Sequence, residues 1–172
     1  PLPAELASGH AAVMMCAGVT VFNPLLKYAS SGRQKVGVLG VGGLGHLAIQ
    51  FAKALGNEVT AISTSSEKED EALSFGAERF MLLTDQDAMD EAEFYFDLLL
   101  VTVSGEMAWV PVIDILRKRG TLILVGFPPV SFNPRDLVSH ELSITGSFIG
   151  NQATMREMLS FSARHKITPQ IE

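Results

Sequence analysis

Residues 35–45 read KVGVLGVGGLG, a short apolar run that leads directly into a cluster of glycines. The glycines Gly40, Gly42 and Gly45 match the spacing G-x-G-x-x-G. Beyond them, apolar side chains recur at helical spacing as far as Leu55, and Gly56 stands where a helix commonly ends. A strand, a glycine turn and an amphipathic helix are therefore predicted in this order.

The glycine spacing is typical of a loop that holds a dinucleotide. In such a loop the first glycine permits a tight turn, the second lets the backbone approach a pyrophosphate, and the third lets helix and strand pack closely. The helix amino terminus adds unpaired N–H groups and a partial positive charge. The predicted cofactor-binding residues here are Gly40, Gly42, Gly43, Leu44 and Gly45. A tight turn without a ligand is the alternative interpretation.

Strand-like and helix-like segments alternate along the rest of the chain. Further strands are expected at 58–62, 80–83, 96–102, 121–126 and 142–147. Helices are expected at 67–75, 109–119 and 153–164 and over most of 4–29, with a proline-rich loop at 128–134. This alternation predicts one α/β domain with a doubly wound, parallel six-stranded sheet, the Rossmann fold.

The turn after the second strand should show which dinucleotide is bound. An acidic residue about 20 residues beyond the glycines would bind the ribose hydroxyls of NAD. This sequence has Ser63, Thr64, Ser65 and Lys68 there instead, which leave room for a 2′-phosphate and can donate to it. NADP is favoured and NAD remains possible, because Glu67 and its acidic neighbours weaken the positive field. Alternatively, Ser66 caps a helix and Lys68 is a solvated surface residue.

Composition excludes several classes of protein. The net charge of −6 argues against a nucleic-acid partner. The single cysteine excludes an internal disulfide and favours a reducing compartment, so a cytoplasmic location is expected. We expect no membrane partner, because no stretch resembles a span of about 20 apolar residues. The chain begins Pro-Leu-Pro without a methionine, and we expect it to be a piece of a longer protein.

Several segments in this order resemble the cinnamyl alcohol dehydrogenase branch of the zinc-dependent medium-chain alcohol dehydrogenases. They are CAGVT at 16–20, GVGGLGH at 40–46, STS at 63–65 with Lys68, TVS at 102–104, LVG at 124–126 and GSFIG at 146–150. The resemblance runs nearly end to end but covers only the cofactor domain and the segment leading into it. It implies a helical lead-in at 1–30 and an NAD(P)-binding domain at 31–172, without the catalytic domain that comes first in that family.

The resemblance also implies roles for individual residues. Cys16 corresponds to a ligand of the catalytic zinc, and Thr20 corresponds to a catalytic threonine near the nicotinamide. The nicotinamide end of the cofactor would be lined by Thr102, Val103, Val125, Gly126, Ser147, Phe148 and Ile149. The implied reaction moves hydride between NADP(H) and an alcohol or aldehyde, with zinc as Lewis acid. A homodimer formed through the sixth strand is a further expectation from the family.

Other interpretations stay open at this stage. A lone cysteine on an apolar helix is usually a buried small hydrophobe, and a catalytic zinc needs three protein ligands. The isolated chain is therefore not expected to hold zinc tightly. The four histidines are scattered, and His46 could approach phosphate or simply lie at the surface, which we favour. The alternatives to a zinc dehydrogenase are a catalytically silent nucleotide-binding module and a zinc-free, quinone-reductase-like relative.

Overall fold

The computed structural model describes residues 2–171 and contains one parallel sheet of six strands. The strand order is β3-β2-β1-β4-β5-β6, and every neighbouring pair runs parallel. The strands are β1 (Lys35–Leu39), β2 (Glu58–Ser63), β3 (Arg79–Leu82), β4 (Phe96–Val101), β5 (Leu116–Leu124) and β6 (Ser143–Gly146). This order confirms the predicted doubly wound Rossmann sheet.

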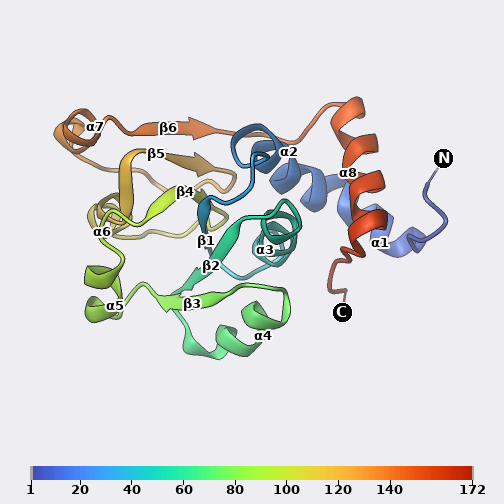
Figure 1. The fold of residues 1–172 in the computed structure, drawn as a ribbon, viewed down its shortest axis with the longest axis horizontal. Helices are drawn as coiled ribbons and strands as arrows, with labels where there is room; N and C mark the ends of the chain where they lie inside the picture. Colours follow the sequence, from blue (N-terminus) through green and yellow to red (C-terminus); the bar gives the residue numbers. More distant parts are fainter. Residues whose placement is uncertain (1, 172) are drawn as a thin grey trace.

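Helices flank the sheet on both sides (Figure 1). The α-helices are α1 (Ser8–Val13), α2 (Val19–Tyr28), α3 (Gly45–Ala54), α4 (Glu69–Ser74), α5 (Gln86–Glu91), α6 (Trp109–Asp114), α7 (Pro134–His140) and α8 (Gln152–His165). A π-helical turn, η1 (Met14–Gly18), joins α1 to α2, and a 3₁₀ turn, η2 (Ser66–Lys68), precedes α4.

The two faces of the sheet belong to separate hydrophobic clusters. Leu98 and Leu100 of β4 pack in the cluster that α2, α3 and α8 cover, whereas Leu99 and Val101 pack in the cluster beneath α5 and α6. Successive side chains of a strand point to opposite faces, so a strand buried on both faces has no polar side. This explains why residues 96–102 form a nearly continuous apolar run.

One predicted helix is partly wrong. The sequence indicated a helix over 109–119, but α6 ends at Asp114 and β5 begins at Leu116. The register of β5 against β4 shifts between Phe96 and Leu98, and Arg119 has a positive φ of 65°. The basic residues 117–119 before Gly120 resemble the end of a helix, but here they belong to a bulged strand. Arg117 Nε of this strand lies 2.6 Å from Asp97 Oδ1.

Two short helices, α5 and α7, were not predicted from the sequence, and the helix cap considered for Ser66 is absent. Asp85 caps α5 by accepting from two backbone amides, and Asn133 caps α7 just before Pro134 at its first turn. The Asn-Pro pair was a usable signal, since proline is favoured at the first helical position. The alternative in which Ser66 caps a helix is not realised, because a 3₁₀ turn at 66–68 precedes α4 and no side-chain cap forms there.

The helical stretch from Ser8 to Tyr28 corrects the expectation about membrane spans. Its 21 residues are long and apolar enough, by length and composition, to cross a bilayer. However, half of the apolar window is buried inside the domain, where Phe22 and Leu25 are fully covered. Buried core helices of globular domains also have this length and composition. Helix α2 packs against α3 and α8 as such a core helix does.

A buried asparagine joins three segments at the amino end of β2. The Asn57 amide donates to the carbonyls of Ala29 (3.0 Å) and Ala52 (3.1 Å), and its Oδ1 accepts from the Gln34 amide (3.2 Å). Asn57→Ala should lower the free energy of unfolding by about 2–3 kcal/mol, because it leaves buried backbone groups unpaired. Urea denaturation would measure this. Asn57→Asp keeps the size and the acceptor but removes the two donated hydrogen bonds. An unchanged free energy of unfolding in both variants would contradict the assignment.

Candidate functional site

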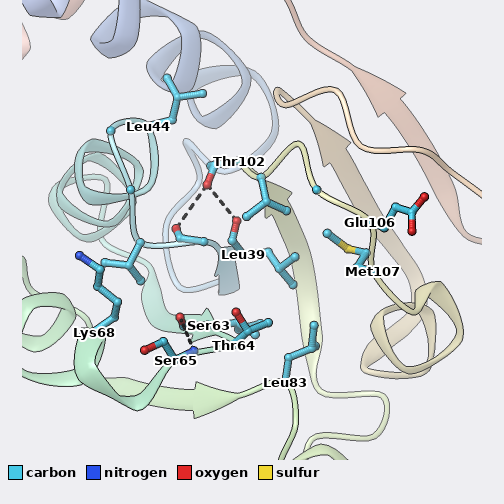
Figure 2. Close-up of a pocket in the computed structure, with 17 residues that line it drawn as sticks. Leu39, Leu44, Ser63, Thr64, Ser65, Lys68, Leu83, Thr102, Glu106 and Met107 are labelled. Carbon is cyan, nitrogen blue, oxygen red and sulfur yellow. Dashed lines mark hydrogen bonds between the residues drawn. The ribbon is translucent and has the colours of Figure 1, made fainter.

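A cavity of about 470 Å³ lies at the carboxyl ends of β1, β2 and β4 (Figure 2). At this point the strand order reverses, with β1 pairing β2 on one side and β4 on the other. In open α/β sheets, the crevice at such a switch point is where ligands bind. Ten of the predicted cofactor residues line this cavity: Gly40, Gly42, Gly43, Leu44, Ser63, Thr64, Ser65, Lys68, Thr102 and Val103.

The glycine loop has a fixed shape. Gly40 has φ +100°, a conformation that L residues with side chains rarely adopt, and its amide donates to the Ile62 carbonyl at 2.8 Å. The Thr102 hydroxyl lies 2.9 Å from the Leu39 carbonyl and 3.3 Å from that of Gly40 (Figure 2). The loop is therefore held from both neighbouring strands.

The middle of the loop leaves space open toward the cavity. A Cβ added at Gly42 or Gly43 would meet no protein atom within 4 Å. Packing alone thus does not explain why these positions carry no side chain. A phosphate group that approaches the backbone closely would explain it, since the first turn of α3 offers unpaired N–H groups there. The loop therefore fits a dinucleotide pyrophosphate.

Hydroxyl groups and one lysine line the cavity at the end of β2. The Ser63 hydroxyl accepts from the Ser65 amide at 3.2 Å, which closes the turn (Figure 2). Lys68 lies on the same side of the cavity, and its Nζ is 2.7 Å from Glu71 Oε2. The turn offers hydroxyl donors and a cation, but a neighbouring carboxylate shares that cation.

Seven residues that line the cavity were not predicted as site residues: Leu39, Val41, Ile62, Leu83, Gly105, Glu106 and Met107. Leu83 follows β3, and Glu106 and Met107 lie in the loop after β4, on the opposite side of the cavity from Lys68 (Figure 2). These residue types carry no motif, so only the expectation that all strand ends meet at one edge could have indicated them.

Of the six other predicted cofactor residues, Gly45 begins α3 and four lie around a second, shallower hollow. Val125, Gly126, Ser147 and Phe148 line it at the ends of β5 and β6. Gly126 also lies close to the first cavity, because a Cβ on Gly126 would stand 2.0 Å from the carbonyl oxygen of Val103, which lines that cavity. Ile149 is held differently: its carbonyl accepts from the Asn23 side chain of α2 at 2.9 Å. Asn23 was not predicted, although it shares a helix face with Cys16 and Thr20.

Cys16 and Thr20 lie on the π-helical turn and at the start of α2. The Cys16 thiol is exposed, whereas Thr20 is buried and its hydroxyl donates to the Cys16 carbonyl at 2.7 Å. Within residues 2–171, no group of three or more His, Cys, Asp or Glu side chains is placed to hold a metal ion. A zinc ion at Cys16 would therefore need ligands from outside the described residues.

His46 does not lie at the surface, which corrects the interpretation favoured from the sequence. Only 6% of it is exposed, and its ring lies between the glycine loop and the end of the chain. Its Nδ1 is 3.1 Å from the Gly42 carbonyl, and its Nε2 accepts from the Gln170 amide at 3.1 Å. Nothing in the sequence indicated the second contact, which joins residues far apart in the chain.

Comparison with known proteins identifies the family and the fold. The family model of zinc-binding dehydrogenases matches residues 43–164. A probable mannitol dehydrogenase of Fragaria ananassa is 41% identical, with 99% of this chain and 49% of the relative covered. The structure of a cinnamyl alcohol dehydrogenase from Sorghum bicolor matches with a TM-score of 0.94 at 35% identity, covering 99% of this chain and 50% of that one.

A second structure contains a coenzyme. It is the cinnamyl alcohol dehydrogenase of Helicobacter pylori complexed with NADP(H), with a TM-score of 0.84, 32% identity, and coverage of 99% of this chain and 48% of that one. The chain spans about half the length of the relatives it matches. Its fold and its family agree with the resemblance seen in the sequence. The chain belongs to the zinc-binding dehydrogenase family.

Proposed function

We propose that this chain is the coenzyme-binding domain of an oxidoreductase that moves hydride between NADP(H) and an alcohol or aldehyde. In this proposal residues 31–172 bind the coenzyme and residues 1–30 lead into them from a catalytic domain elsewhere in the full protein. One observation carries it: an open glycine loop at the switch point of the sheet faces a hydroxyl-lined turn with a lysine.

Each group of residues takes a part in coenzyme binding. The backbone at Gly40, Gly42, Gly43, Leu44 and Gly45 would hold the pyrophosphate, and Ser63, Thr64, Ser65 and Lys68 would hold the 2′-phosphate. The nicotinamide end would lie toward Thr102, Val103, Val125, Gly126, Ser147, Phe148 and Ile149. The solved relative complexed with NADP(H) supports the phosphate form of the coenzyme, and NAD is the less favoured alternative.

Cys16 and Thr20 take parts that need the rest of the protein. Cys16 would supply one zinc ligand, and zinc would provide the Lewis acid that polarises the alcohol or aldehyde oxygen. The exposed thiol is accessible to ligands from another domain. The Thr20 hydroxyl already donates to a backbone carbonyl, so it would present its lone pairs, not its proton, to a neighbour.

Two further proposals concern the assembly and its location. Among residues 2–171, β6 pairs only with β5, so its other edge could pair with that of a second copy in a homodimer. Sedimentation analysis would test this. A cytoplasmic location accords with one exposed free thiol, which an oxidising compartment would leave open to modification.

Calorimetric titration of this chain with NADPH and NADH tests the proposed function directly. We expect binding of both, with NADPH tighter. Tighter binding of NADH would overturn the assignment of the turn at 63–68 to a 2′-phosphate. Binding of neither coenzyme would overturn the coenzyme-binding function.

Lys68→Ala should weaken NADPH binding about tenfold at low ionic strength and leave NADH binding unchanged, because only NADPH carries a 2′-phosphate. Glu71→Gln is the matched variant: it removes the carboxylate 2.7 Å from the lysine and should leave NADPH binding equal or tighter. Calorimetry measures both. Equal losses for NADPH and NADH in Lys68→Ala would mean that the lysine does not contact the 2′-phosphate.

A further inference from the structure

The His46 ring bridges the glycine loop and the carboxyl-terminal segment. It lies in the first turn of α3, is buried, and packs against the Phe75 ring at 5.4 Å between centroids. One ring nitrogen faces the Gly42 carbonyl and the other faces the Gln170 amide, each at 3.1 Å. Both nitrogens are thus used within the domain.

The Gln170 contact fixes the proton on the ring. A backbone N–H can only donate, so Nε2 must accept and carries no proton. In the neutral ring the proton is then on Nδ1, which donates to the Gly42 carbonyl. The carboxyl-terminal segment is itself held on α3, since Gln50 Nε2 donates to the Thr168 carbonyl at 3.1 Å.

The contact with Gly42 has a consequence for the loop. The Gly42 carbonyl accepts from both the backbone amide and Nδ1 of His46, which turns it toward the helix. The carbonyl of Gly42 and the N–H of Gly43 share one planar trans peptide and point in opposite directions. The His46 ring, together with the His46 backbone amide, therefore holds the Gly43 N–H pointing away from the helix, in a loop where a Cβ on Gly43 would meet nothing within 4 Å.

We infer that His46 is a positioning residue for the coenzyme: its Nδ1 aligns the Gly43 N–H with the pyrophosphate, and Gln170 holds the ring in the tautomer that does so. This inference rests on the proposed function, because it assumes that a pyrophosphate lies at the loop. It assigns to the carboxyl-terminal segment an effect on coenzyme affinity without contact with the coenzyme.

Two amide substitutions of His46 test the roles of its two ring nitrogens separately. Asn at position 46 places an N–H donor where Nδ1 stands, and Gln places a carbonyl acceptor near Nε2. His46→Asn should therefore keep most of the NADPH affinity, whereas His46→Gln should weaken NADPH binding about tenfold, the loss expected for one misaligned hydrogen bond to a charged group. Gln170→Pro removes the amide proton and should weaken NADPH binding in the same direction.

The experiment is calorimetry of this chain and the three variants with NADPH and with adenosine 2′-monophosphate, which lacks the pyrophosphate. The smaller ligand should bind all four proteins equally, and thermal unfolding of each should be recorded. Equal NADPH affinities for His46→Asn and His46→Gln, or affinities that follow thermal stability with both ligands, would overturn the inference. Failure of the unmodified chain to bind either ligand would instead overturn the proposed function.

Discussion

Gly42→Ala should weaken NADPH binding by about a hundredfold without lowering thermal stability. Gly42 has no positive φ, and an added methyl group would meet no protein atom within 4 Å. In the free protein the substitution is therefore harmless, and it can add a few tenths of a kcal/mol by restricting the unfolded chain. In the complex the methyl group would occupy the space of the pyrophosphate and displace it from the backbone amides. Loss of two such charge-assisted hydrogen bonds, at about 1.4 kcal/mol each, gives the hundredfold.

Calorimetry with NADPH and a thermal melt, carried out on the same preparation, measure both parts of this result. Gly105→Ala is the matched control, because Gly105 also borders the cavity and a Cβ there also meets nothing within 4 Å. It lies after β4, away from the glycine loop, and should change affinity little. Unchanged affinity in Gly42→Ala would show that the coenzyme does not lie against the loop.

The sequence was informative wherever one local pattern determined one structure. The strand at 35–39, the glycine turn and the helix after it were predicted almost to the residue, because apolar period and glycine spacing agree there. The boundary at 114–116 was missed because a basic run before Gly120 fits a helix end as well as a bulged strand. The difference depends on Asp97 of the neighbouring strand, which sequence spacing cannot place.

The same distinction applies to the site. Motif residues such as Gly40 and Ser63 could be predicted because their chemistry is local. Glu106 and Asn23 could not, because one borders the cavity and the other contacts Ile149 only through the tertiary arrangement of the chain. His46 was seen but misinterpreted, since its second partner is 124 residues away in the sequence. Contacts between residues that are far apart in the sequence and belong to no motif could thus not be predicted from the sequence pattern.

Gly45→Ala should have the opposite effect from Gly42→Ala: a large loss of stability. An ideal Cβ at Gly45 would stand 1.9 Å from the Gly40 carbonyl oxygen, far inside contact distance. Gly40 cannot move away easily, because its amide donates a hydrogen bond to the Ile62 carbonyl and its positive φ fixes the turn. Separating α3 from β1 enough to fit the methyl group should cost about 3 kcal/mol, which corresponds to a Tm lower by roughly 6–12 °C for a domain of this size.

Differential scanning calorimetry of Gly45→Ala beside Gly43→Ala checks this expectation. The two glycines are neighbours in the same loop, but a Cβ at Gly43 meets nothing within 4 Å, so Gly43→Ala should melt within about 2 °C of the unmodified chain. A similar Tm for both variants would show that the helix does not approach the strand as closely as the structure places it. Different outcomes at these two glycines would instead separate two requirements of this loop: Gly45 is required by the packing of the fold, and Gly42 and Gly43 by the ligand.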